Sequence, residues 1–408
     1  MITNMINRYF PYILIYMCYY TNLPVKLEEL TMIIFITWYI LEKKFFELKL
    51  NLNIIGIISV VGSISLIQSY KNNYPVDRVL DQLLVIVVMF IGYDLLFKKY
   101  GYKKLFSIYL KVSYFICLLG ILQFLVFIFL KIDILKYPIG SSYKALPMLK
   151  YGIPRIRSVA YEPGWLAQTL VPAVIYSLEV LKISRKLQKK YLVIIFVFFM
   201  TMSTGALISI PLYFILVKFK NRKEIMSSIF TVIILGWLTK DAWINKVIDT
   251  LSSLKKLQTG VFHDINASSF AILSNLYVAL NNKNLFFGVG LGNHPYSYFR
   301  NFIDKKIGVY HFYGLNAMDA YSLLTRIISE LGIVWTLLFI ISLIMNINLK
   351  NNIKSIINIG AFLGIFSFLI RGGLYTKFGT TFILLLFYYT RKQRQRSREV
   401  QNNTLDSI

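Results

Sequence analysis

Two arginines and a glutamate stand directly before an apolar segment of this chain. In PRIRSVAYEPGWLAQTL, Arg155 and Arg157 are two residues apart, and Glu162 lies five residues after Arg157. Pro154 favours an extended approach, and alternate residues of an extended chain point the same way, so both guanidiniums could face one cavity. A guanidinium binds phosphate oxygens through two parallel hydrogen bonds and stays charged at any working pH. The pattern predicts an anion site in which Glu162 binds an arginine, orients it or acts as a base; the alternative is an arginine anchored at a membrane surface beside a counter-ion.

The three histidines of the chain, His263, His294 and His311, all fall in its second half. Histidine is the usual proton acceptor in catalysis because its pKa lies near neutrality. His311 is the favoured base, since it precedes a predicted helix with Arg326 and Glu330 one turn apart on the same face. That pair is either an ordinary helix-stabilising pair or a functional one near the outer membrane boundary, where charged side chains are costly.

The segment FFGVGLGNHPYSYF, Phe286–Phe299, predicts a glycine-rich turn beside His294. It is not a nucleotide-binding fingerprint, because no strand–loop–helix unit and no GK[ST] sequence accompany it. A metal site is not expected either, since the histidines are widely spaced and no HxxxH or HExxH occurs. Cys18 and Cys117 lie inside apolar runs and cannot form a CxxC metal pair.

These residues must be positioned by a strongly apolar chain. Of its 408 residues 56% are hydrophobic, and the mean hydropathy is +0.59. Apolar runs of roughly 15 to 22 residues recur, which predicts an all-α polytopic membrane protein; a β-barrel would need alternating hydrophobicity. The net charge of +26 falls in short clusters between the apolar runs, so we expect a membrane-loop pattern and no nucleic acid partner.

About twelve apolar segments are candidate transmembrane helices. They cover approximately residues 9–24, 28–42, 52–70, 79–97, 105–130, 164–181, 190–203, 204–218, 225–239, 329–348, 355–370 and 373–390. The loops that follow every second span are basic, as in KKYGYKK at 98–104, and the intervening short loops carry at most one or two cations. Positive residues stay in the cytoplasm, so both termini, including the basic tail 391–408, are predicted to be cytoplasmic.

This topology leaves two extended outer loops, residues 131–163 and 240–328, within a single membrane domain that spans residues 1–408. Long loops without evident secondary structure tend to carry function. The second loop contains an apolar run, Ser268–Leu280, of about 13 residues, which is too short to cross a bilayer comfortably. We therefore expect a surface or re-entrant helix there, lying in the outer interface.

Four motifs of this outer face resemble those of bacterial polysaccharide polymerases in the O-antigen polymerase (Wzy) and O-antigen ligase superfamily. RxRSxxxEPGxxA at Arg155–Ala167 is similar to the family's arginine-rich stretch that opens a transmembrane helix, and STGALISIPL at Ser203–Leu212 to its next helix pair. FFGVGLGN at Phe286–Asn293 is similar to the family's glycine turn, and HFYGLNAMDAYSLLTRIISELG at His311–Gly332 to its His-Asn helix. The order and spacing of all four agree over roughly residues 150–335.

Two departures qualify the resemblance: His311 lies five residues before Asn316 rather than beside an Asn, and Thr204 stands where the family has an arginine. The tighter pattern of the ligases is not met, which favours a polymerase. The resemblance implies a multi-pass glycosyltransferase of the bacterial cytoplasmic membrane without a cofactor. Its substrate would be an undecaprenyl-diphosphate-linked oligosaccharide, and its partners would be membrane lipid, a flippase and a chain-length regulator.

The resemblance also implies roles for particular residues. Arg157 would neutralise the charge that develops on the leaving diphosphate, and His311 or Glu162 would take the proton of the acceptor hydroxyl. The residues implied to bind substrate are Arg155, Arg300, Arg326, Glu330, Asn316 and His294.

A polysaccharide flippase or another secondary transporter is the main alternative. Such a protein should carry charges near the middle of the bilayer. Asp94 and Lys111 come nearest to that, but both lie within about two turns of the basic loop 98–104, so that Lys111 can reach the membrane surface. The charges concentrate instead in outer loops of unequal length, which favours the polymerase or, within the same superfamily, the ligase.

Overall fold

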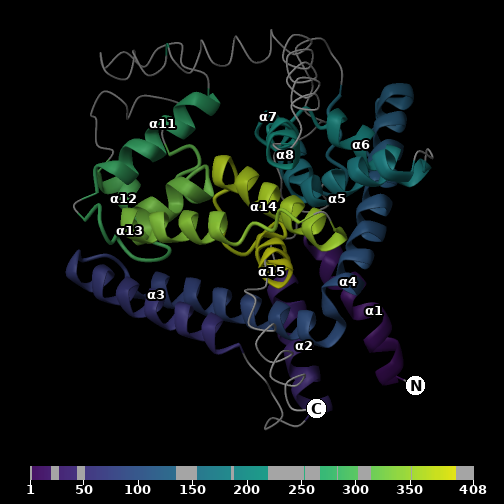
Figure 1. The fold of residues 1–408 in the computed structure, drawn as a ribbon. Coiled ribbons are helices and arrows are strands. Elements are labelled where there is room, and N and C mark those ends of the chain that lie inside the picture. Colours follow the sequence, from purple (N-terminus) through teal and green to yellow (C-terminus); the bar gives the residue numbers. More distant parts are fainter. Residues whose placement is uncertain are drawn as a thin grey trace.

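The structure, a computed structural model, describes residues 2–19, 27–43, 51–134, 154–184, 188–218, 252, 267–282, 284–301, 314–350 and 352–391. Within these ranges every element is a helix, as the fold class predicts. The helices are α1 (Ile2–Met17), α2 (Leu27–Lys43), α3 (Leu52–Lys71), α4 (Val76–Leu130), α5 (Pro163–Ser184), α6 (Lys189–Met200), α7 (Thr204–Leu207), α8 (Ser209–Lys218), α11 (Ala267–Leu280), α12 (His294–Asn301), α13 (Leu323–Met345), α14 (Ile353–Ile370) and α15 (Thr380–Thr390). Figure 1 shows α14 and α15 near the centre, with α11, α12 and α13 on one side and α5, α6 and part of α4 on the other.

Five of the described helices, α3, α4, α5, α13 and α14, are long and apolar enough to cross a membrane. The chain is therefore a helical membrane protein. The ninth predicted span, 225–239, and most of the basic tail lie outside the described residues, and twelve spans with cytoplasmic termini stay a prediction. The apolar run expected to form a short outer helix is helical as α11, and one of its faces is buried.

The long helix α4 joins the fourth and fifth predicted spans. The segment 98–104, expected as a loop, is helical on both sides of Gly101, where the backbone leaves the helical region with φ 71°. The side chains near this break keep the predicted basic character: Lys99 pairs with Glu42, and its ammonium lies 3.9 Å from the ring centroid of Trp38. The expectation of a loop is wrong here, because only one residue is needed to redirect the chain.

Helices α5 and α14 run antiparallel and form the centre of the core. Glycines of α14 bring the backbones close: a β-carbon at Gly360 would lie 3.1 Å from Pro172 Cα of α5. Small residues at helix contacts allow this approach in membrane proteins. At one end of the pair, the Gln168 side chain donates to the carbonyl of Ser367 (3.0 Å). At the other end Tyr176 of α5 and Ile357 of α14 line the same hollow.

Helix α13 breaks at Gly332, where φ is 87°, although the sequence predicts an uninterrupted span. The glycine-rich segment 285–290 fills the break by backbone pairing. Val289 and Gly290 donate to the carbonyls of Ser329 and Glu330 (3.0 and 2.9 Å), and residues 333 and 334 donate back to residues 285 and 286 (2.9 and 3.3 Å). Glycine permits this close backbone approach, since a β-carbon at Gly332 would overlap the Phe286 carbonyl.

Candidate functional site

A carboxylate and a guanidinium meet where α5 begins and α14 ends. Glu162 precedes Pro163, the first residue of α5, a position that suits proline because its missing N–H would have no helical partner. Arg371 directly follows α14, and its Nη2 donates to Glu162 Oε2 at 3.0 Å. The two side chains are 27% and 32% exposed, so both stay accessible to a ligand.

Arg155 brings a second cation to this point. Its Nε donates to the carbonyl of Thr201 (2.8 Å) and its Nη2 to that of Met202 (3.3 Å), at the end of α6. Carbonyls at a helix end lack helical partners and favour a cation. Burial lowers the pKa of Arg155, the positive charge of Arg371 lowers it further, and Glu162 opposes both. Two guanidiniums therefore share the surroundings of one carboxylate.

The Ser203–Gly205 segment forms the wall beside these charges. A β-carbon at Gly205 would lie 3.6 Å from Arg371 Cβ, and one at Gly164 would lie 3.6 Å from Ser203 Oγ. The Ser203 hydroxyl is buried and has no hydrogen-bond partner within the described residues. The Ser203–Gly205 segment thus lies against the start of α5 that follows Glu162. We name Glu162, Arg155, Arg371 and Ser203 the EPG cluster.

Arg157 has a partner of its own. Its Nη2 lies 2.5 Å from Asp133 Oδ2, and both side chains are almost fully buried. Gln123 donates to the other oxygen of Asp133 (2.9 Å) and accepts from the backbone N–H of Ser158 (2.9 Å). The guanidiniums of Arg155 and Arg157 therefore bind different groups. Arg157 holds the 154–162 segment to the end of α4, while Glu162 pairs with Arg371 instead.

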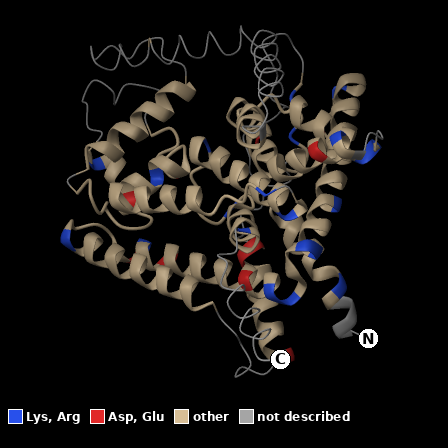
Figure 2. Ribbon diagram, viewed as in Figure 1, with Lys and Arg blue, Asp and Glu red and all other residues tan. Residues whose placement is uncertain are grey.

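A second cluster of polar groups surrounds a single arginine of α13, Arg326. The predicted pair Arg326 and Glu330 forms, with Nε and Oε1 3.0 Å apart, and it is buried. Arg326 also donates to the carbonyl of Gly373 (2.9 Å) and to Gln82 Oε1 (3.1 Å), and its guanidinium lies 4.7 Å from the centroid of the Tyr375 ring. Figure 2 shows that charged positions occur inside the helical body, on α13 among other helices.

The segment Arg371–Gly373 connects the two clusters. The N–H of Gly372 donates to the carbonyl of Tyr321 (2.8 Å), and the Arg371 guanidinium lies 5.7 Å from the Tyr321 ring. A β-carbon at Gly373 would overlap the carbonyl of Asp319, so this close approach requires glycine. Burial raises the pKa of Asp319, although Tyr321 N–H and Asn316 donate to its carboxyl at 3.1 Å each.

The other predicted site residues lie apart from the EPG cluster. His294 is fully buried. Its Nε2 donates to Asn275 Oδ1 at 2.8 Å, and this oxygen is the acceptor because the amide nitrogen of Asn275 faces backbone carbonyls. Its Nδ1 accepts from the Ser329 hydroxyl, also at 2.8 Å. Burial, with the charge of Arg326, lowers the pKa of His294 to about 3, so the ring stays neutral.

Arg300 donates to the carbonyl of Asn72 (3.1 Å) and covers the Tyr74 ring. It therefore lies beside the connection between α3 and α4. His263 and His311 lie outside the described residues.

Sequence reasoning missed Arg371. It falls between two predicted spans that are only two residues apart, and so short a connection offered no motif. The available signal was a cation at the predicted outer end of an otherwise apolar span, where a charge is costly. Its partner Glu162 is 209 positions away along the chain, and local spacing does not reveal such a pair.

The EPG cluster is suited to binding an anion, because it contains two guanidiniums, Arg155 and Arg371, and one carboxylate, Glu162, and so has an excess of positive charge. Among the described residues, no three His, Cys, Asp or Glu side chains come together as metal ligands. No family model, no curated protein and no solved structure matches this chain.

Proposed function

We propose that the chain is a polysaccharide polymerase of the bacterial cytoplasmic membrane, which transfers a growing glycan from undecaprenyl diphosphate to a hydroxyl of a lipid-linked repeat unit. The arrangement of charges in the EPG cluster supports this proposal. Arg155 and Arg371 lie beside Glu162 at the end of two apolar helices, and Arg371 is partly exposed. The excess positive charge suits a lipid diphosphate, whose headgroup lies at the membrane surface.

In the proposed reaction the acceptor hydroxyl oxygen bonds to the anomeric carbon of the donor sugar as the bond to the diphosphate oxygen breaks. The hydroxyl proton passes to a base, and the lipid diphosphate leaves with the negative charge. Arg371 and Arg155 stabilise that charge as it develops. Glu162 orients Arg371 through the hydrogen bond of 3.0 Å. His311 stays the proposed base.

Arg157 acts in this proposal as a positioning residue. Its ion pair with Asp133 is buried and neutral overall, so it holds the chain that carries Arg155 and Glu162 rather than touching the diphosphate. The buried Arg326 has a similar part. It donates to the carbonyl of Gly373 and so holds the segment that presents Arg371.

The alternative of a transporter is favoured by one observation, the interruption of α13 at Gly332 beside the buried Arg326–Glu330 pair. Broken helices with buried charges line the substrate sites of many secondary transporters. The ligase alternative differs only in the acceptor that it would use.

An elongation assay separates these functions. The purified full chain, reconstituted in vesicles with lipid-linked repeat units from a polysaccharide-producing cell, should yield longer glycans and release lipid diphosphate. Movement of the repeat unit across the bilayer without elongation would contradict the polymerase and support the transporter. Transfer to a different acceptor, without growth of the repeat-unit chain, would support the ligase.

A further inference from the structure

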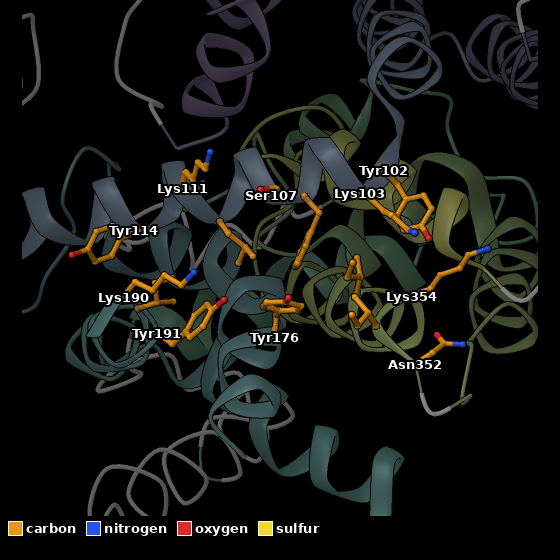
Figure 3. A pocket seen from close by; sticks show the side chains of 15 residues that line it. Tyr102, Lys103, Ser107, Lys111, Tyr114, Tyr176, Lys190, Tyr191, Asn352 and Lys354 are labelled. Carbon is orange, nitrogen blue, oxygen red and sulfur yellow. The ribbon is translucent and has the colours of Figure 1, made fainter. Parts of the chain in front are cut away.

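A lysine-lined hollow lies at the far end of the α5–α14 pair from the EPG cluster. It has a volume of about 820 Å³ and is lined by α4, α5, α6 and the start of α14. Lys103, Lys111, Lys190 and Lys354 all contribute to its wall. Figure 3 shows Lys103 and Lys354 at one end and Lys190 with Tyr114 at the other. The fifteen described residues that line it include no Asp or Glu.

Three of these lysines come from basic segments that are distant in sequence: Lys103 from 98–104, Lys190 from the start of α6 and Lys354 from the start of α14. Their convergence gives the hollow a positive charge that no lining carboxylate offsets. The same segments are the ones predicted to face the cytoplasm. The cytoplasmic leaflet carries anionic lipids, and basic pockets between transmembrane helices on that side bind their headgroups.

The rest of the wall suits a lipid rather than a soluble anion. Phe106, Ile194 and Ile357 form a buried apolar floor. At the rim Ile353 is 62% exposed, so the hollow borders an apolar surface that acyl chains can cover. Tyrosines occupy the space between the lysines, and Figure 3 shows the hydroxyls of Tyr176 and Tyr191 directed towards α4. Tyrosine is enriched at the level of lipid headgroups because its ring is apolar and its hydroxyl polar.

The hollow also lies at a suitable depth. Lys354 is the second residue of α14 and Arg371 directly follows its last residue, and the 18 residues of this helix span about 27 Å at 1.5 Å per residue. That length approaches the roughly 30 Å of the hydrocarbon core of a bilayer. The lysines of the hollow and the EPG cluster therefore lie near opposite membrane surfaces.

We propose that this hollow is a binding site for the phosphate-bearing headgroup of an anionic phospholipid. Lys103 and Lys354, at one end of the hollow, bind the phosphate, Lys190 at the other end adds to the positive charge that attracts the headgroup, and the acyl chains lie against the apolar rim. The site is separate from the EPG cluster, and its occupancy can be measured without any glycosyl transfer. One lysine near a membrane surface contributes about a fivefold preference for anionic over neutral lipid, which corresponds to about 1 kcal/mol.

The test is native mass spectrometry of the purified full chain, titrated with phosphatidylglycerol, with phosphatidylcholine of the same acyl chains, and with soluble glycerol phosphate. The wild-type chain should bind phosphatidylglycerol at least about tenfold more tightly than phosphatidylcholine, and glycerol phosphate weakly. The Lys103→Ala/Lys190→Ala/Lys354→Ala variant should lose most of this preference. An unchanged preference in the variant would overturn the proposal, and tight binding of glycerol phosphate would overturn the assignment to a lipid.

If the triple variant does not fold, a pair of single substitutions still tests the proposal. Lys189 and Lys190 are adjacent and exposed, but of the two only Lys190 lines the hollow. Lys190→Ala should weaken phosphatidylglycerol binding about fivefold, whereas Lys189→Ala should change it less than about twofold. Equal effects of the two substitutions would mean that general surface charge, not the hollow, attracts the lipid.

Discussion

Arg371 differs from the buried arginines Arg157 and Arg326 in that part of its side chain stays open to a ligand. Arg157 and Arg326 are held by carboxylates inside the fold and are almost fully buried. Arg371 pairs with a carboxylate that is itself about one third exposed. The pair is therefore worth little to stability, and its main expected contribution is to the charge of the EPG cluster.

Replacing Arg371 should affect elongation more than folding. Arg371→Ala should lower the elongation rate about 10²-fold or more, because one group that stabilises developing charge is lost. Arg371→Lys should keep part of the rate, since the charge remains but the two parallel hydrogen bonds do not. Lys71→Ala, which removes an exposed cation at the end of α3, is the control. Near-normal product length in Arg371→Ala would remove this residue from the site.

The effects of substituting Arg157 and Asp133 on stability should not be additive, because the two side chains form one buried ion pair. Either Arg157→Met or Asp133→Leu leaves a buried charge without its partner, at an expected cost of roughly 3–5 kcal/mol in stability. The double variant should lose less than either single variant, because no unpaired charge remains. Thermal unfolding in detergent measures all three. Full stability of Arg157→Met with loss of elongation would instead assign Arg157 a direct part in the reaction.

His294 should give the stability a defined pH dependence. Its pKa of about 3 in the folded chain lies below its ordinary value of 6.5, so between these values only the unfolded chain binds the proton. The contribution of the neutral ring is complete above pH 6.5 and falls as the pH is lowered towards 3, by at most about 1.4 kcal/mol per pH unit. His294→Gln should flatten the dependence of the unfolding midpoint on pH between about 5 and 6.5. Parallel pH curves for the two proteins would show that the ring titrates normally.

At the scale of elements, the break in α13 depends on glycine. A β-carbon at Gly332 would overlap the Phe286 carbonyl, and its φ of 87° is costly for other residues. Gly332→Ala should therefore destabilise the chain by about 1–3 kcal/mol or more. Gly56→Ala, in α3, meets no atom within 4 Å and should be neutral or stabilising by up to about 1 kcal/mol. Equal melting temperatures of the two variants would mean that the backbone pairing at the break is not needed.

The sequence predicts the positions of the helices better than it predicts which distant groups form hydrogen bonds with them. Apolar runs and their lengths indicate most of the described helices, and the spacing of Arg326 and Glu330 predicts their ion pair correctly. The break at Gly332 is not predictable from α13 alone, because its hydrogen-bond partners lie in residues 285–290. His294 is a similar case: its neutral, buried state depends on Asn275 and on α13, which local spacing cannot reveal.

At the scale of the whole molecule, the lysine-lined hollow and the EPG cluster should face opposite sides of the membrane. Lys71, at the end of α3, is predicted to lie on the same outer side as the EPG cluster. The single substitutions Lys103→Cys and Lys71→Cys, both at exposed positions, therefore test the predicted sidedness with a membrane-impermeant thiol reagent. The Lys103→Cys variant should react only after the membrane is opened, whereas the Lys71→Cys variant should react in intact cells. The native Cys18 and Cys117 are buried and should react little in either case. Labelling of both variants from the same side would contradict the predicted topology.

The pairing between α13 and residues 285–290 has a consequence for biosynthesis. An amide or carbonyl exposed to hydrocarbon is costly, so the groups released by the break need partners before α13 meets lipid. The glycine-rich segment precedes α13 in the chain and leaves the ribosome first. Its N–H and C=O groups are therefore available when residues 329–334 emerge from the translocon. The order of synthesis matches the order in which these hydrogen bonds can form, and the broken helix can enter the bilayer without a later rearrangement.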